Sequence, residues 1–235
     1  MKRLLGDLWL VSGREITHPF DATAYFIPGA EPTLIDVGST EGYPALKRNL
    51  AELGYQPRDI RRVIGTHGHW DHLSGMAALR KESDAELLLH EGDRQQVETG
   101  DYDLTSSFLY GHPFPPVSVD RPLQDGDIFS LNGYELTVYH TPGHTAGSVC
   151  LLTEIEGKKL LIAGDTIWGA HHPRIGSDLE VWRQSLDRIL GLDFDVMTFG
   201  HWSSLVVDAK PKVEKAVVGF ATYFDPWFTL EGRGV

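Results

Sequence analysis

The segment THGHWDH, residues 66–72, places four side chains that can bind metal ions within six positions: His67, His69, Asp71 and His72. Imidazoles with a carboxylate favour zinc, iron and similar ions at a catalytic rather than a sulfur-rich structural site. His67 and His69 alternate at the expected end of a strand, so both should face one ion. Asp71 and His72 begin an expected helix and leave the backbone in other directions, which favours a second ion nearby.

Three later segments contain further candidate ligands, each in or beside a glycine-containing turn after an apolar run. They are His144 in HTPGHTAGS, Asp165 in IAGDT and His201 in TFGHW. Loops at strand ends are where a rigid scaffold displays reactive groups. Each residue alone would be unremarkable, but together with residues 66–72 they indicate one shared site.

The elements that must position these residues follow from hydrophobic patterning. Apolar runs predict strands at 7–13, 23–29, 32–38, 61–67, 85–90, 127–141, 147–165 and 195–202, of which 23–29 and 32–38 form a hairpin. Helical spacing and end signals predict helices at 43–54, 71–83, 91–98, 178–192 and 210–224. Most strands fall into two groups, 7–66 and 119–163. This order favours a mixed α/β fold of two sheets covered by helices.

Composition narrows the class of protein. The 235 residues are 41% hydrophobic and 23% charged, as in folded globular proteins, and we expect a single domain over residues 1–235. The apolar start is interrupted by Gly6 and Asp7, and no later run reaches the ~20 residues of a membrane span, so we expect a cytoplasmic protein without membrane association. The formal charge of −12 argues against a nucleic-acid partner and leaves a small-molecule substrate. The oligomeric state stays open, a homodimer included.

Two further features bear on the site. The single cysteine, Cys150, excludes an internal disulfide and a cysteine-based zinc cluster, and its setting predicts a buried strand residue. Residues 100–118 lack clear periodicity, and long irregular segments in compact domains are often functional loops or lids. The alternative is a loop packed on the surface.

The order His67, His69, Asp71, His72, His144, Asp165 and His201 resembles the metallo-β-lactamase superfamily over nearly the whole chain, and this motif set is highly specific. The resemblance implies a four-layer αβ/βα sandwich of two mixed β-sheets flanked by helices. It also implies two divalent metal ions, Zn²⁺ before Fe or Mn, at one edge between the sheets. The ligands it implies are His67, His69 and His144 for the first metal, Asp71, His72 and His201 for the second, and Asp165 as the bridge. Asp36 matches a position beneath the site from which a carboxylate orients a ligand.

The chemistry implied by this resemblance is hydrolysis. Two such ions can hold a shared hydroxide, because zinc lowers the pKa of bound water to about 7. Asp71 is the expected catalytic residue, which orients the hydroxide and relays a proton to the leaving group. Asp165 disfavours a true β-lactamase, since those members lack a bridging aspartate there. Its presence resembles the glyoxalase II, lactonase, arylsulfatase and RNA-processing branches, and the acidic charge argues against the last.

Substrate contacts are expected from Arg174, Trp168, His172 and Tyr110. Arg174 matches a basic position of glyoxalase II-like proteins that contributes to binding an anionic substrate, although no glutathione-binding extension is expected after His201. Trp168 stands where acyl-homoserine lactonases have a catalytic tyrosine, which puts that activity in doubt. The tryptophans next to ligands, Trp168 with Trp70 and Trp202, either wall the pocket or pack in the core. For the arginine and the histidine, the alternative is a solvated loop side chain.

The sequence therefore predicts a metal-dependent hydrolase that cleaves a small ester, thioester or lactone. One alternative is a mononuclear iron oxidoreductase similar to persulfide dioxygenases, which resemble glyoxalase II. The other is a non-catalytic metal-binding protein on the same fold.

Overall fold

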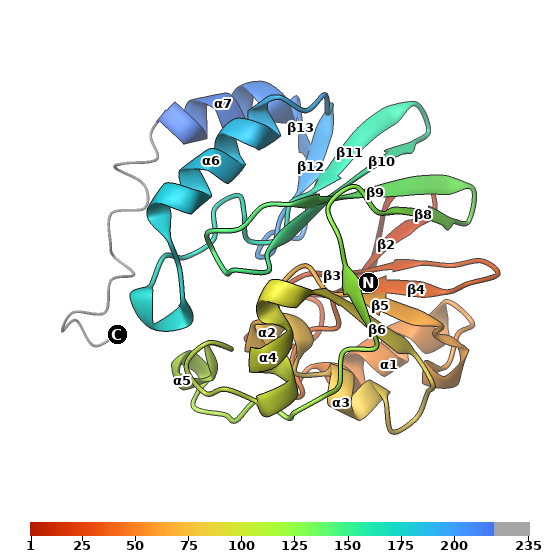
Figure 1. Ribbon diagram of the computed structural model, residues 1–235. Helices are drawn as coiled ribbons and strands as arrows, with labels where there is room; N and C mark the ends of the chain where they lie inside the picture. Colours follow the sequence, from red (N-terminus) through yellow and green to blue (C-terminus); the bar gives the residue numbers. More distant parts are fainter. Residues whose placement is uncertain (219–235) are drawn as a thin grey trace.

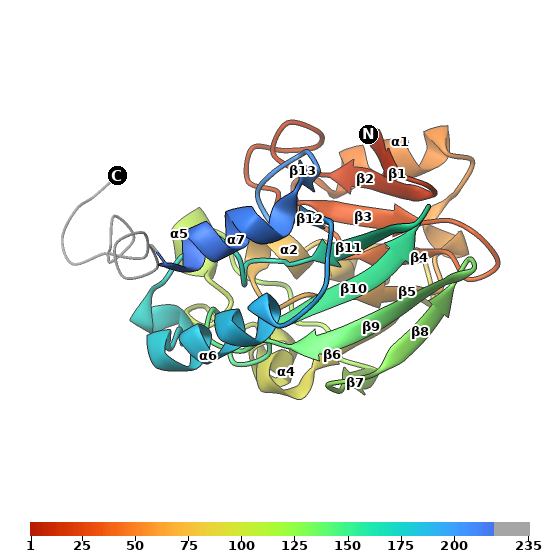
Figure 2. The ribbon, with the colours of Figure 1, turned by 90° about the horizontal axis from the view of Figure 1, so that it is seen from above.

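The protein is described by a computed structural model over residues 1–218 (Figures 1 and 2). Two β-sheets pack face to face, and helices cover their outer faces, so the layers run helix, sheet, sheet, helix. In Figure 1, α6 and α7 lie over the upper sheet, and α1 and α3 lie beneath the lower one. The predicted four-layer sandwich is confirmed.

The first sheet contains seven strands, which pair in chain order. They are β1 (Lys2–Leu5), β2 (Leu8–Ser12), β3 (Ala24–Ile27), β4 (Thr33–Ile35), β5 (Arg62–Ile64), β6 (Glu86–His90) and β7 (Arg121–Leu123). Neighbours are antiparallel from β1 to β4, which confirms the hairpin of β3 and β4, and parallel from β4 to β7.

The second sheet contains six strands in the order β13-β12-β11-β10-β9-β8. They are β8 (Ile128–Leu131), β9 (Tyr134–His140), β10 (Val149–Ile155), β11 (Lys158–Ile162), β12 (Val196–Thr198) and β13 (Val206–Val207). Only β11 and β12 run parallel within it. The predicted strand groups, 7–66 and 119–163, had wrong bounds. The first sheet also contains β6 and β7, and the second also contains β12 and β13.

The helices are α1 (Tyr43–Glu52), α2 (Trp70–Leu73), α3 (Met76–Leu79), α4 (Glu91–Thr99), α5 (Ser107–Tyr110), α6 (Leu179–Leu190) and α7 (Ala209–Val218), with 3-10 turns η1 (Pro57–Asp59) and η2 (Pro173–Ile175). The single helix predicted at 71–83 is wrong. Its ladder breaks because the Ser74 carbonyl accepts the Thr40 hydroxyl at 3.0 Å, while the Ala78 amide turns to Gly75. The helix predicted at 210–224 agrees with α7 to Val218, and 219–224 lie outside the described residues.

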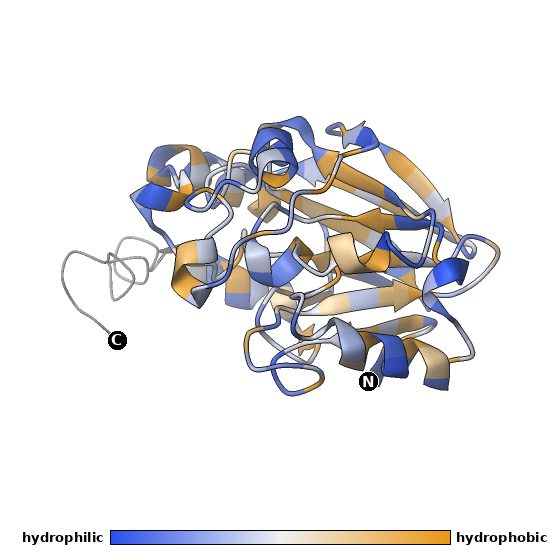
Figure 3. Cartoon of the chain, turned by 90° about the horizontal axis from the view of Figure 1, so that it is seen from below, coloured by the Kyte–Doolittle hydropathy of each residue, from blue (hydrophilic) through white to orange (hydrophobic). Residues whose placement is uncertain are grey.

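Three buried apolar clusters fill the three interfaces between the layers. Because side chains alternate across a strand, β5 directs Val63 toward the helices and Ile64 toward the other sheet. In β10, Leu151 faces the first sheet and Cys150 faces α6, so Cys150 is the buried strand residue predicted. Figure 3 shows this hydrophobic concentration along the strands, with hydrophilic residues on the helices. No helix within residues 1–218 is long and apolar enough to cross a membrane.

The parallel strands determine where the candidate ligands gather. The carboxyl ends of neighbouring parallel strands meet at one edge of a sheet, where ligand sites of such sheets lie. Asp36 directly follows β4, and His67 lies in the loop after β5, its parallel neighbour. Asp165 and His201 follow β11 and β12 in the same way. The fold therefore brings four separate segments to one edge.

Candidate metal centre

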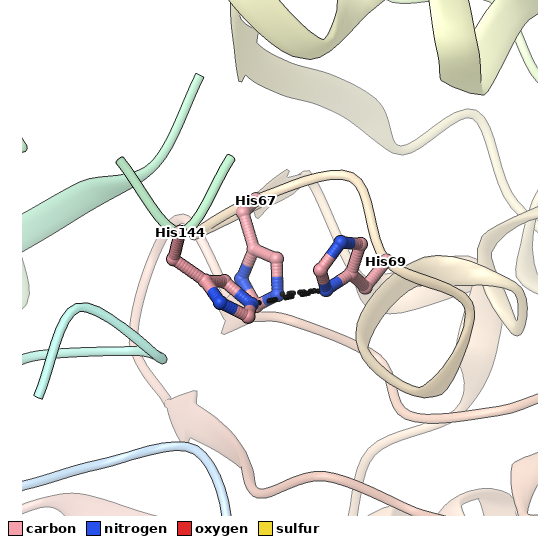
Figure 4. Close-up of side chains that lie close together, drawn as sticks. All are labelled: His67, His69 and His144. Carbon is pink, nitrogen blue, oxygen red and sulfur yellow. Dashed lines mark hydrogen bonds between the residues drawn. The ribbon is translucent and has the colours of Figure 1, made fainter. Parts of the chain in front are cut away.

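Three histidines form the first ligand group, shown in Figure 4. The Nε2 atoms of His67 and His144 each lie 3.0 Å from Nδ1 of His69. All three side chains are buried. Burial and the neighbouring imidazoles lower the pKa of His67 and His69 well below the ordinary value, and burial lowers that of His144 to about 4. The rings are therefore neutral near pH 7, which is the form that binds metal.

Hydrogen bonds outside this group determine which ring nitrogens carry protons. His144 Nδ1 lies 2.8 Å from the Ala170 carbonyl, which can only accept, so Nδ1 donates and Nε2 keeps its lone pair. His67 Nδ1 lies 3.1 Å from the Thr66 hydroxyl, whose own proton is donated to Asp36 Oδ2 at 2.7 Å. His67 therefore also presents a bare Nε2. The bare Nε2 atoms of His67 and His144 both face Nδ1 of His69, and one ligand atom from each of the three residues lies within 4.8 Å of the others, as a shared metal ion would need.

The second ligand group contains Asp71, His72 and His201. His72 Nδ1 donates to Asp36 Oδ2 at 2.8 Å, which leaves Nε2 to face Asp71 Oδ2 at 3.8 Å. His201 Nε2 lies 3.5 Å from the same Asp71 oxygen. The structure thus places Asp36 beneath the site, in contact with one histidine directly and with another through Thr66. Thr66 was not singled out from the sequence.

Asp165 lies between the two groups. Its Oδ1 is 3.4 Å from His72 Nε2, and its Oδ2 is 3.1 Å from His201 Nε2 and 3.6 Å from His144 Nε2. His67, His72 and Asp165 also form a third set of converging ligand atoms. The seven residues predicted as ligands therefore meet in one place, and their binding of metal stays a prediction.

The donor set fits divalent metal ions. His72 Nε2 and Asp165 Oδ1 are buried without a hydrogen-bond partner, and buried polar atoms rarely stay unpaired. Burial alone would lower the pKa of His72, but Asp165, Asp71 and Asp36 raise it well above the ordinary value. The buried carboxylates thus require positive charge at this point. Imidazole and carboxylate ligands without thiolates suit zinc, iron and manganese better than metals that prefer sulfur.

Asp93, in the first turn of α4, joins the loops that carry the first ligand group. Its Oδ2 accepts from the Gly68 amide and the Thr145 hydroxyl, each at 2.7 Å, and its Oδ1 accepts from the Gly147 amide at 2.7 Å. The side chain is fully buried, and burial raises its pKa despite these donors. Sequence reasoning missed it, because an acidic residue in a first helical turn is ordinary.

A cavity of about 620 Å³ opens onto the ligand groups, within the size range of small-molecule sites. Tyr110 and Trp168 line it as expected. Burial and the Asp71 carboxylate raise the pKa of Tyr110 well above its ordinary value. Residues 100–118 contribute Ser106, Leu109 and Tyr110 to the wall, and a lid role for them stays a prediction.

Arg174 and His172 do not line this cavity. Arg174 forms an ion pair with Asp103 at 2.6 Å, and its guanidinium lies 3.9 Å from the centre of the Phe108 ring. His172 caps η2, where its Nδ1 accepts from the Arg174 amide at 3.0 Å. The sequence suggested that both side chains contact substrate, but these partners hold them outside the lining of the cavity. The neighbouring His171 lines the wall instead.

The tryptophans next to the ligands divide between core and cavity. Trp70 is fully buried in the helix-facing core and stacks on Tyr110, with ring centres 4.7 Å apart. Trp202 is exposed and outside the lining, so only Trp168 of the three walls the cavity. Phe20 also lines the cavity and packs edge-on against Tyr110, with ring centres 5.6 Å apart. The sequence offered no signal for Phe20.

Comparison with known proteins is consistent with this geometry. The model of the family described as the metallo-beta-lactamase superfamily matches residues 18–201. A probable metallo-hydrolase of Methanocaldococcus jannaschii is 30% identical over 151 residues, 64% of this chain and 69% of that protein. A hydroxyacylglutathione hydrolase of Maricaulis maris is 29% identical over 135 residues, 57% of this chain and 44% of that protein. The solved structure of the metallo-β-lactamase MIM-1 from Novosphingobium pentaromativorans is 26% identical, with a TM-score of 0.73, covering 94% of this chain and 88% of that one.

Proposed function

This chain belongs to the metallo-β-lactamase superfamily, and we propose that it uses two divalent metal ions, zinc in the first place, to hydrolyse a small ester, thioester or lactone. The observation that carries the proposal is the position of Asp165. One carboxylate oxygen lies 3.4 Å from His72 and the other 3.6 Å from His144, so a single side chain contacts both ligand groups. A carboxylate in this position suits a pair of adjacent ions, because each of its oxygens can bind one of them.

Each part of the reaction has a residue to support it. Divalent ions held by these ligands supply an activated water and polarise the carbonyl oxygen of the substrate. Asp71 belongs to the second group and contacts Tyr110, and in this proposal its carboxylate orients the attacking water, takes a proton from it and passes that proton to the leaving group. Asp36 accepts from Nδ1 of His72, and the Thr66 hydroxyl accepts from Nδ1 of His67. These two contacts orient both rings so that Nε2 is directed at the site.

Support for ester, thioester or lactone substrates comes from two sources. The name of the Maricaulis maris relative describes hydrolysis of an acylated glutathione, although this chain matches only 44% of that protein. By the family resemblance, Asp165 also stands at a position where the β-lactam-hydrolysing members have no bridging aspartate. Because MIM-1 is nevertheless a metallo-β-lactamase, a β-lactam belongs in the substrate panel.

The test combines elemental analysis with a panel of thioesters, esters, lactones and a β-lactam. We expect two metal ions per chain and turnover of at least one of the first three classes. Asp71→Asn should bind the second metal more weakly and, with metal added until both sites are filled, lose about 10²- to 10⁴-fold in kcat, the usual contribution of a general acid or base. Asp187→Asn, at an exposed position of α6, is the matched control and should change neither quantity.

Three outcomes would contradict parts of this proposal. One iron per chain with oxygen uptake and no hydrolysis would indicate an oxidoreductase instead. Two bound metals without turnover of any panel member would indicate a non-catalytic metal-binding protein. Full turnover by Asp71→Asn with both metals bound would remove the proton-relay role of Asp71 alone.

A further inference from the structure

The wall of the cavity beside the ligand groups is apolar and partly exposed. Phe20, Leu109 and Trp168 line it and are 40%, 38% and 37% exposed, although large apolar side chains are usually buried. Exposed apolar surface that gathers around a cavity marks a binding site. These side chains come from two loops and from helix α5, which are remote in sequence, so the wall is a product of the fold.

Arg14 is the only lysine or arginine among the residues of the described chain that line the cavity. It forms no ion pair or hydrogen bond within residues 1–218, in contrast to Arg174, whose charge is met by Asp103. Two of the three acidic lining residues, Asp71 and Asp165, belong to the ligand groups. Their carboxylates contact His72 and His201, and neither forms an ion pair with Arg14 within the described residues.

Asp21, the third acidic residue of the lining, does not neutralise Arg14 either. Its Oδ1 accepts from the Ser39 amide at 2.9 Å and from the Ser39 hydroxyl, and its Oδ2 accepts from Ser12 at 3.1 Å and from Thr17. Its hydrogen-bonding capacity is therefore filled by neutral donors. These bonds anchor the loop between β2 and β3, which carries both Arg14 and Phe20 to the cavity.

Ser106 supplies a second unused polar group. It is 2% exposed, its hydroxyl has no hydrogen-bond partner, and it lines the cavity from the start of α5. Its φ of 59° lies in the left-handed region, which residues other than glycine rarely adopt and which is common at ligand sites. His171 Nδ1 is likewise buried, unpartnered and in a residue of the wall. Polar groups buried without partners in a wall are expected to meet a ligand.

We propose that the substrate combines an apolar acyl group with a carboxylate. The apolar part packs against Phe20, Leu109 and Trp168, the carboxylate pairs with Arg14, and the Ser106 hydroxyl donates to a substrate oxygen. This inference rests on the proposed function, because the scissile carbonyl is taken to lie at the ligand groups. A volume of about 620 Å³, shared with the metal ions and water, limits the substrate to a small molecule.

The test uses pairs of thioesters that differ only in charge. The benzyl thioester of glutarate is compared with that of 5-methylhexanoate, in which an isopropyl group replaces the carboxylate, and a second pair is one methylene longer. With metal-loaded protein we expect kcat/KM for the charged member to be higher by about tenfold or more, the usual weight of one hydrogen bond to a charged group, which the isopropyl group cannot form. Arg14→Met should remove this preference by lowering kcat/KM for the charged member.

Matched variants separate this effect from general changes in charge or folding. Arg58→Met alters the net charge equally at an exposed position outside the cavity and should leave the preference intact. Ser106→Gly removes the hydroxyl, and glycine tolerates the positive φ. It should raise KM by up to about tenfold, the usual weight of one hydrogen bond. Calorimetric binding of the corresponding benzylamides, which resist hydrolysis, measures recognition without turnover.

The outcomes distinguish this inference from the proposed function. Hydrolysis of both members without charge preference, or a preference that survives Arg14→Met, overturns the inference and leaves the function standing. If neither thioester is cleaved but the charged benzylamide binds better in an Arg14-dependent way, recognition stands and thioester hydrolysis fails. Absence of both turnover and preferential binding overturns both.

Discussion

Replacement of Asp93 by asparagine tests whether one buried carboxylate holds the first ligand group together. Gly68, whose amide it binds, lies between His67 and His69, and Thr145, whose hydroxyl it binds, directly follows His144. The third donor is the Gly147 amide, and all three distances are 2.7 Å. Asp93→Asn keeps the size of the side chain and changes only its charge and its acceptors.

The magnitude follows from the hydrogen-bond geometry. Asparagine has one acceptor oxygen, so in either orientation its NH₂ group faces the Gly68 amide or the Gly147 amide, and one buried N–H loses its acceptor. An unsatisfied buried donor costs about 1–3 kcal/mol, and the remaining bonds lose their charge assistance, about 1 kcal/mol each. Burial of a neutral group in place of a charge offsets part of this loss, as the raised pKa of Asp93 indicates. We expect a net loss of about 2–3 kcal/mol in the free energy of unfolding.

Two measurements check this prediction. Urea unfolding of the metal-free protein gives the change in stability, and competition with a chelator gives metal affinity, which should weaken by about 10- to 100-fold as for other outer supports of metal ligands. Asp84→Asn, at an exposed position, is the matched control. An Asp93→Asn protein within about 0.5 kcal/mol of the parent, the range of surface substitutions, and with unchanged metal affinity would refute the reasoning. Lost stability with unchanged affinity would restrict Asp93 to a structural role.

Three further predictions concern the surroundings of the site. Asp36→Asn should weaken binding of the second metal ion by about 10- to 100-fold, because His72 loses its carboxylate acceptor. Asparagine tolerates the φ of 58° at this position. Equal affinities of the variant and the parent in metal titration would contradict this prediction. Gly143→Ala should destabilise the protein by about 2 kcal/mol or more, because the new Cβ would lie 2.2 Å from the Trp182 Cα. The φ of Gly143, 131°, is also unfavourable for alanine. An unchanged melting temperature would argue against this prediction. Burial and a neighbouring imidazole lower the pKa of His90 from 6.5 to about 4. The unfolded chain therefore binds the proton more readily, and the stability that neutral His90 contributes above pH 6.5 is lost as pH falls toward 4. His90→Gln should flatten the dependence of urea stability on pH in that window, and an equally steep dependence would show that another group is responsible.

Local patterns carried much of the prediction. Apolar runs at β3, β5 and β10 indicated strands, and the structure places their side chains in the clusters on both faces of the sheets. The candidate ligands were recognisable because metal-binding residue types follow one another at short spacing, as in residues 66–72. One expected reason for their convergence was wrong. The strand β5 ends at Ile64, so strand alternation does not align His67 with His69, and they meet because the loop before α2 turns them together.

Local sequence patterns could not predict the contacts that shape the cavity. Whether an arginine is free or paired depends on what the fold places beside it, and Asp103 meets Arg174 while no described residue meets Arg14. Trp70 stands between two candidate ligands in sequence, yet its ring points into the core.

The sequence by itself determined the kinds of ligand, their order and the family, because these depend on side-chain chemistry and short spacing. The tertiary structure alone decided how the ligand loops are held and which side chains face the substrate. Asp93 reaches partners 25 and 54 residues away, and such a long-range hydrogen bond has no signature in local periodicity. Its physical origin is the packing of α4 against two loops from different sheets, which removes the carboxylate from water and leaves three backbone or hydroxyl donors as its only partners among the described residues.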